Sequence, residues 1–177
     1  MLPNRLGSGF EIIVTQQVAF HGQRLLTMPT FSGVEAVDLV LADDEDDNLD
    51  VAEMSLTCHG FDEDRISRVN CGEDAIDNVL ELQESDDVDD PVIVLLDLNM
   101  PPKMGGAEAA ERIRTMMGNE ELARNVMLVC CSAGRVEDLK SQSWAHNFDH
   151  FCTKPFTPQT AEELATAIEQ WCEEQDE

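Results

Sequence analysis

The sequence predicts an α/β fold, a doubly wound sheet of five parallel strands with five helices, from the order of its apolar segments. Short apolar runs alternate along the chain with segments whose apolar residues recur at helical spacing. Three of the runs are continuously apolar, as strands buried on both faces of a parallel sheet are. Five such alternations imply right-handed crossovers that place helices on both faces of the sheet.

The expected strands are short. The first covers residues 37–42, and the second, which has the weakest pattern, covers 66–69. The third covers residues 92–96, the fourth 126–131 and the fifth 148–153. Between these runs the apolar residues change from continuous stretches to helical spacing.

Each strand is followed by a segment whose apolar residues fall on one helical face. The expected helices carry their apolar residues at Leu49, Ala52 and Leu56; at Ala75, Ile76, Val79 and Leu80; at Ala107, Ala110, Ile113 and Met117; at Val136, Leu139 and Trp144; and at Ala161, Leu164, Ala165, Ile168, Trp171 and Cys172. These faces are the surfaces that we expect to cover the sheet.

The composition excludes several classes of function. The chain has 11 Lys and Arg against 37 Asp and Glu, a net charge of -26, so we expect cations or basic protein surfaces as partners and no nucleic acid. No apolar run approaches the roughly 20 residues of a membrane helix, so no membrane partner is expected. The six cysteines are dispersed, without a CxxC motif or an evident signal peptide. They predict reduced thiols and a cytoplasmic location.

The N-terminal part of the chain differs in charge from the rest. Its first 34 residues hold two Arg and one Glu, a net of +1, which leaves -27 for residues 35–177. We therefore expect an N-terminal extension over residues 1–35 and one folded domain over residues 36–177. Three interpretations of the extension stay open: a disordered or lightly docked segment, an organelle transit peptide, or an upstream start whose true initiator is Met28.

The polar residues at the strand ends predict a site at one edge of the sheet. Asp43 and Asp44 follow the first strand, Asp97 the third, Ser132 the fourth and Lys154 the fifth. In open α/β sheets ligands bind beyond the carboxyl ends of the strands. Three carboxylates with one Lys repel one another unless a cation joins them, and oxygen ligands suit Mg²⁺. A central carboxylate can attack phosphorus to give an acyl phosphate, while a metal and a Lys neutralise the charge.

With the strings around them, these residues resemble the receiver domain of two-component response regulators. The matching strings are LVLADDEDD, VLLDLNMP, SA after the fourth strand and TKPF after the fifth. The resemblance covers about residues 36–175 and implies the flavodoxin-like receiver fold. The string DLNMPPKMGG is most similar to single-domain regulators paired with phytochrome-type or other hybrid histidine kinases.

The resemblance also implies a role for each site residue. Asp97 would accept the phosphoryl group and, with Asp44 and the main-chain carbonyl of Asn99, would bind Mg²⁺. Asp43 would act on the metal largely through water. Lys154 would pair with Asp97 or with its phosphate.

Further residues would carry the switch. Ser132 would bond the phosphate, and Phe151 would turn inward as Ser132 moves. Gly105 would give the tight turn after Asp97. The chain departs from the usual pattern at Ser132, where Thr is commoner, at Phe151, which lacks the hydroxyl of Tyr, and at Met104, where Asp is frequent.

The expected function is a stand-alone response regulator receiver in phosphorelay signal transduction. A histidine kinase or phosphotransfer protein would donate the phosphoryl group, and the output would be a surface change and binding, of which a homodimer is one form. Such a protein catalyses only its own phosphorylation and dephosphorylation, so it is not a conventional enzyme. The alternative is a degenerate receiver that binds proteins unphosphorylated. A haloacid-dehalogenase-type phosphatase is disfavoured, because its nucleophile precedes its acidic pair, whereas Asp43 and Asp44 precede Asp97 here.

Overall fold

The computed structural model describes residues 16–18, 26–28, 34–84, 90–122 and 125–175. Most of the expected N-terminal extension lies outside these residues. The three interpretations of the extension therefore concern a part of the chain that lies outside the described residues. The described part of the extension consists of β1 (Gln16–Val18) and β2 (Leu26–Met28), which pair antiparallel.

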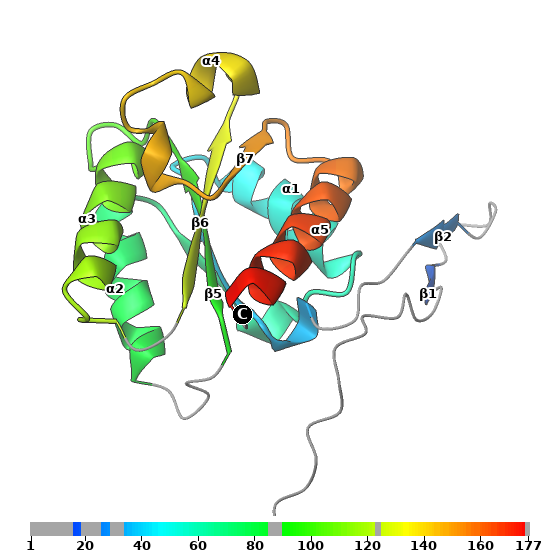
Figure 1. Ribbon diagram of the computed structural model, residues 1–177. Coiled ribbons are helices and arrows are strands. Elements are labelled where there is room, and N and C mark those ends of the chain that lie inside the picture. The colour runs from blue at the N-terminus through cyan, green and yellow to red at the C-terminus, as the bar shows by residue number, and fades with distance from the viewer. Residues whose placement is uncertain (1–15, 19–25, 29–33, 85–89, 123–124, 176–177) are drawn as a thin grey trace, which may run out of the picture.

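The described residues from 34 onward form a sheet of five parallel strands between two layers of helices (Figure 1). The strands are β3 (Asp38–Ala42), β4 (Ile66–Val69), β5 (Val92–Asp97), β6 (Val126–Ser132) and β7 (His150–Thr153). They lie in the order β4-β3-β5-β6-β7, and each pairs in parallel with its neighbours. The order reverses at β3, because the chain returns past it from β4 to β5. Ligand sites of open α/β sheets form at such a switch point.

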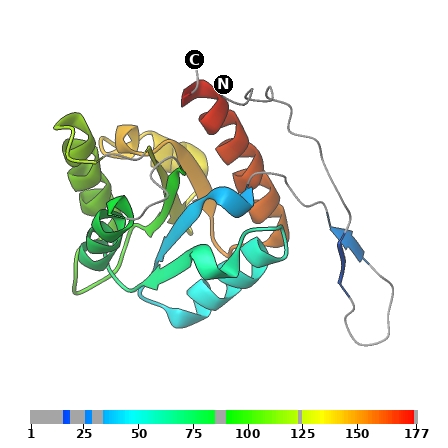
Figure 2. The same cartoon turned by 90° about the horizontal axis from the view of Figure 1, so that it is seen from below.

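Helices cover both faces of this sheet (Figure 2). The α-helices of the described chain are α1 (Asp46–Thr57), α2 (Gly72–Gln83), α3 (Gly106–Gly118), α4 (Val136–Lys140) and α5 (Pro158–Gln175). Short 3₁₀ helices are η1 (Val34–Ala36), η2 (Glu63–Arg65) and η3 (Ala145–Asn147). Helices α1 and α5 lie on one face, and α2 and α3 on the other. The predicted doubly wound fold is confirmed. None of the described helices is long and apolar enough to cross a membrane.

Alternate residues of each inner strand enter different halves of the core. In β3, Leu39 and Leu41 belong to the cluster under α1 and α5, whereas Val40 and Ala42 belong to the cluster under α2 and α3. The side chains of a strand point alternately to its two faces. Since both faces are covered, the positions between the strand ends are apolar, which is why the runs are continuous. Val34 of η1 also joins the α1 and α5 cluster, with 1% of its surface exposed.

Two expected elements end elsewhere in the structure. The helix predicted through Trp144 stops at Lys140, since Gln142 donates its N–H to Leu139, three residues back, and the chain continues in short turns. The predicted strand from 148 begins at His150, because the N–H of Phe148 is bonded to Ala145 in the turn of η3.

The expected apolar face of α2 is also narrower than the sequence suggested. Ala75 and Val79 are fully buried against the sheet and α3, and Ile76 packs at their edge. Leu80 is 40% exposed, so its predicted place on the buried face is wrong. The buried stripe of α2 runs through Ala75 and Val79, which are four residues apart. Leu80 follows Val79 in sequence, and this step turns its side chain about 100° around the helix, away from the stripe.

At the amino-terminal edge of the sheet, Arg65 forms ion pairs with the first residue of β3 and with the segment that precedes β5. Its guanidinium donates to Asp38 at 3.0 Å and to Asp90 at 2.9 Å. Asp90 closes the acidic segment 84–90, of which residues 85–89 lie outside the described chain. This end of the segment is therefore fixed by an ion pair.

Candidate functional site

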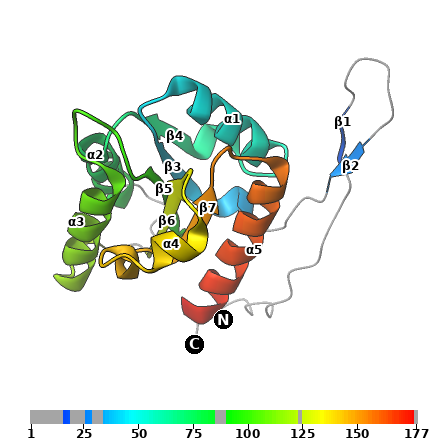
Figure 3. The same ribbon diagram turned by 90° about the horizontal axis from the view of Figure 1, so that it is seen from above.

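The carboxyl-terminal edge of the sheet carries the polar residues predicted there, and Figure 3 looks onto it. Asp43 directly follows β3, Asp97 is the last residue of β5, Ser132 is the last residue of β6, and Lys154 directly follows β7. Asp43, Asp97 and Ser132 are buried, and Asp44 is exposed. The strand ends thus bring together residues from four segments of the sequence.

The three carboxylates form one cluster. One oxygen each of Asp43, Asp44 and Asp97 lies within 4.8 Å of the other two. The ammonium group of Lys154 lies 3.2 Å from Asp97 Oδ2 and is also ion-paired with Asp43. Three negative charges therefore face a single positive one, and the set attracts a further cation.

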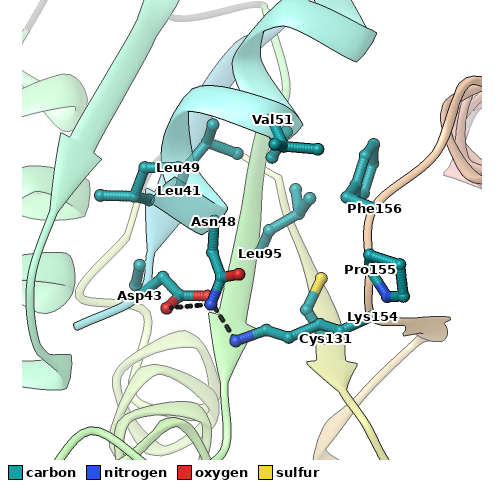
Figure 4. A pocket seen from close by; sticks show the side chains of 12 residues that line it. Leu41, Asp43, Asn48, Leu49, Val51, Leu95, Cys131, Lys154, Pro155 and Phe156 are labelled. Carbon is teal, nitrogen blue, oxygen red and sulfur yellow. Dashed lines mark hydrogen bonds and ion pairs between the residues drawn. The ribbon is translucent and has the colours of Figure 1, made fainter. Parts of the chain in front are cut away.

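Asp43 is held in place by α1. Its Oδ1 accepts hydrogen bonds from the backbone N–H of Glu45 at 3.1 Å and from Asn48 Nδ2 at 3.0 Å. Figure 4 shows the side chains of Asn48 and Lys154 reaching toward this carboxylate. The sequence analysis missed Asn48. The signal for it is its place in the first turn of the helix that begins just after the acidic pair.

Two effects of opposite sign set the proton affinity of Asp97. Burial, the larger effect, raises the pKa of Asp97, and the charge of Asp43 adds to this. Lys154 opposes both by its charge and its hydrogen bond, and the net pKa remains raised. Burial lowers the pKa of Lys154, but the hydrogen bond to Asp43 and the charges of Asp97 and Asp43 outweigh it, so its pKa is raised.

Two glycines allow α3 to start against the end of β5. A Cβ on Gly105 would lie 2.3 Å from the carbonyl oxygen of Leu98, and a Cβ on Gly106 would lie 2.3 Å from that of Asp97. The sequence analysis singled out Gly105 and missed Gly106. The buried Met104 precedes them, and its carbonyl accepts the N–H of Gly72 at 2.9 Å.

A cleft opens beside the carboxylates. Its lining includes Asp44, Asp97, Asn99, Ser132 and Lys154, all of which the sequence analysis selected. The backbone N–H of Asn99 donates to the Asp97 carboxylate, and Ser132 Oγ accepts the N–H of Gly134 at 3.3 Å.

Phe151 is not among the described residues that line this cleft. Its ring lies 5.9 Å from the ring of Phe148, and Lys140 Nζ lies 5.7 Å from its centroid. The structure therefore places the predicted switch aromatic, partly buried, against the α2 and α3 core cluster and next to Lys140 of α4.

The donor set at the cleft fits a hard divalent cation. It consists of carboxylate oxygens on three closely spaced side chains, one of which, Asp44, is exposed to solvent and leaves room for water ligands. Mg²⁺ prefers oxygen ligands and keeps several waters. Asp44 and Asp97 are the residues that could hold such an ion from the cleft.

Comparisons with known proteins were made by sequence and by structure. No protein-family model and no curated protein matches the sequence. A CheY-like response regulator receiver domain protein from Methanospirillum hungatei is similar in structure, with 24% identity and a TM-score of 0.56, over 77% of this chain and 96% of that one.

Two further solved structures show the same likeness. One is the receiver domain of a sensor histidine kinase from Pseudomonas aeruginosa with a magnesium ion coordinated in its active site cleft, at 22% identity and a TM-score of 0.54, over 72% of this chain and 93% of that one. The other is a bacteriophytochrome response regulator at 18% identity and a TM-score of 0.57, over 74% of this chain and 76% of that one. This chain therefore shares the fold of response regulator receiver domains.

Proposed function

We propose that this chain is a response regulator receiver that accepts a phosphoryl group on Asp97. The observation that carries the proposal is the placement of the Asp97 carboxylate, 3.2 Å from the Lys154 ammonium, in an acidic cleft at the switch point of the sheet. A phosphorylated imidazole of a histidine kinase or phosphotransfer protein is the proposed donor, and the proposed location is the cytoplasm.

The proposed reaction is a single displacement at phosphorus. An Asp97 oxygen forms a bond to the phosphorus atom, the P–N bond to the donor imidazole breaks, and the imidazole leaves with the electron pair. Lys154, already paired with Asp97, moves its contact to a phosphoryl oxygen. The product is an aspartyl phosphate.

Asp44, Asp97 and the main-chain carbonyl of Asn99 are proposed to hold Mg²⁺, with Asp43 acting through water. When bound, the ion would neutralise charge on the transferring phosphoryl oxygens. Asp43 suits the indirect role, because both of its oxygens already have partners in Lys154, Glu45 and Asn48.

Ser132 and Phe151 are proposed to pass the change on to the surface. The Ser132 hydroxyl faces the cleft and would donate to a phosphoryl oxygen, giving up its contact with Gly134. Movement of Ser132 makes room for Phe151, which would then leave its contact with Lys140 of α4. The surface next to α4 would change, which is where a target or a second copy would bind.

Intact mass spectrometry tests this function. The chain is incubated with Mg²⁺ and acetyl phosphate, beside the Asp97→Asn variant and the control variant Asp47→Asn. The exposed carboxylate of Asp47 lies in the acidic run 43–47 but outside the cluster of Asp43, Asp44 and Asp97. We expect one phosphoryl group on wild type and on Asp47→Asn, none on Asp97→Asn, and none after Mg²⁺ is removed.

Two results would contradict the proposal. Equal uptake by Asp97→Asn would remove Asp97 from its role. No uptake by a folded wild type, even from a phosphorylated phosphotransfer protein, would favour the unphosphorylated binding module.

A further inference from the structure

Cys131 and Cys152 lie side by side in the sheet, one step behind the cleft. They are register partners on β6 and β7, so their side chains project from the same face. That face packs under α1 and α5, and both residues belong to its core cluster. Only 8% of Cys131 and 4% of Cys152 is exposed.

The two thiols are placed as a disulfide requires. Neighbouring strands lie about 4.8 Å apart, within the roughly 4.4–6.8 Å between Cα atoms that a disulfide spans. Both cysteines are free thiols in this structure. Closing the bond therefore requires side-chain rotation without a shift of register.

We propose that Cys131 and Cys152 are an oxidation site, at which a hydroperoxide converts the two thiols into a reversible disulfide between β6 and β7. This proposal does not depend on phosphorylation of Asp97.

A cavity gives the oxidant access. Cys131 lines a cavity of about 70 Å³ between α1 and the segment Lys154–Phe156, whose walls include Leu41 and Leu95 (Figure 4). A water molecule occupies about 30 Å³ in the liquid, so hydrogen peroxide fits this space. The neighbouring Cys130 points to the other face of the sheet and does not line the cavity.

The surroundings of the pair favour one thiolate. The hydrogen bond from Cys131, and a further one with His150, lower the pKa of Cys152 to about 6 against the cost of burial. The same hydrogen bond and burial raise the pKa of Cys131. Burial raises the pKa of Cys130 to about 12. In this pair a thiol therefore lies beside a base that can take its proton.

The oxidation balances in two steps. In the first step the Cys131 sulfur attacks one peroxide oxygen and passes its proton to the Cys152 thiolate, while the O–O bond breaks. The products are Cys131 sulfenic acid and a hydroxide ion. The hydroxide then takes the proton from Cys152, which gives water and restores the Cys152 thiolate. The Cys152 thiolate then attacks the sulfenic sulfur and expels hydroxide. One thiol, one thiolate and one hydrogen peroxide give one disulfide, one water and one hydroxide.

The link would tie together the strands that carry two site residues. Cys131 directly precedes Ser132, and Cys152 lies two residues before Lys154. A covalent bond between them therefore fixes the separation of these strand ends.

Thiol counting on the full chain tests the proposal. The protein is treated with one equivalent of hydrogen peroxide, unfolded, alkylated with iodoacetamide and weighed intact. We expect four alkylated cysteines in place of six, a loss of two hydrogen atoms, and recovery of all six after reduction. Cys131→Ala and Cys152→Ala should abolish this loss, while Cys130→Ala, the adjacent cysteine on the opposite face, should keep it.

Peptide mapping identifies the bonded pair even if the Cys131→Ala and Cys152→Ala variants do not fold, because it leaves both of these cysteines in place. In a Cys130→Ala, Cys172→Ala double variant, trypsin releases residues 125–135 and 141–177 with one cysteine each. We expect these two peptides to be joined in a monomeric product. Six alkylated thiols after peroxide treatment, or a bond that joins other cysteines, would overturn the proposal.

Discussion

At Asp97, burial and a neighbouring carboxylate oppose ionisation while Lys154 favours it, and the net effect is a raised pKa. The folded state therefore binds a proton at Asp97 more tightly than the unfolded state does. Between the ordinary carboxyl pKa and the raised one, stability falls as the pH rises, because the folded chain must then carry the ionised group. At neutral pH the ionised Asp97 destabilises the fold.

Replacing Asp97 by Asn should therefore raise the free energy of unfolding at neutral pH without Mg²⁺. Lys154 keeps Asp43 as its partner in this variant. The gain should shrink as the pH falls toward the ordinary carboxyl range, where Asp97 of the wild type becomes protonated. Calorimetric melting over this pH range measures it, with Asp47→Asn expected within about 0.5 kcal/mol of wild type. A less stable Asp97→Asn variant at neutral pH would refute this account.

The residues at the strand ends were predictable one by one, and their supporting contacts were not. Asp97 and Lys154 follow apolar runs, so their place at one edge of the sheet follows from the parallel topology. Asn48 lies inside a helix, and its contact with Asp43 depends on the rotation of α1 about its axis. That rotation is set by packing against β3 and α5, which no local pattern encodes.

Among the elements, α3 depends most directly on a missing side chain. It begins at Gly106, where a Cβ would lie 2.3 Å from the carbonyl oxygen of Asp97 and 2.8 Å from Leu96 Cβ. Both contacts involve the end of β5, so the helix and the strand approach each other at the phosphoacceptor proposed here. At the other end of α3, a Cβ on Gly118 would meet no atom within 4 Å.

Gly106→Ala should lower the free energy of unfolding by about 1–3 kcal/mol, because the backbone at Asp97 must shift to make room. Gly118→Ala is the matched control in the same helix. It should leave stability unchanged or raise it by up to about 1 kcal/mol, since Ala favours a helix over Gly. Urea titrations followed by circular dichroism measure both variants. Equal stabilities would mean that the start of α3 tolerates a side chain.

Element boundaries show where sequence patterns stop being informative. The inner strands were predicted within a residue or two, since buried runs end where polar residues begin. The helix predicted through Trp144 ends at Lys140 instead, because Ser141, Gln142 and Ser143 follow and turn hydrogen bonds replace helical ones. Trp144 is still half-buried, packed against Phe148 with 5.8 Å between ring centroids. A buried aromatic therefore fits a turn as well as a helix.

For the whole molecule, the dominant electrostatic fact is the net charge of -26. Several arginines form ion pairs that connect elements: Arg65 with Asp38 and Asp90, Arg68 with Asp50 and Glu53, and Arg114 with Asp149. The large excess of carboxylates nevertheless repel one another in the compact state.

Added NaCl should therefore raise the melting temperature. The Debye length falls from about 30 Å at 0.01 M salt to about 8 Å at 0.15 M, which screens repulsion across the surface more than short ion pairs. Wild type and Asp44→Asn should respond alike to NaCl in scanning calorimetry. Low concentrations of Mg²⁺ should stabilise wild type more than Asp44→Asn, because Asp44 is a proposed ligand. A melting temperature that falls with NaCl would contradict dominant repulsion.

The two outermost strands of the sheet limit how a partner can attach. The edge strands β4 and β7 have four residues each, against five to seven in the inner strands. On β4 the exposed Arg68 also places a charged side chain at this edge. Short edges offer little backbone for an incoming strand, and a charged side chain such as Arg68 disfavours pairing further. The sheet is therefore protected from edge-to-edge aggregation, and recognition of this protein must occur through side chains on its helices and loops rather than by extension of its sheet.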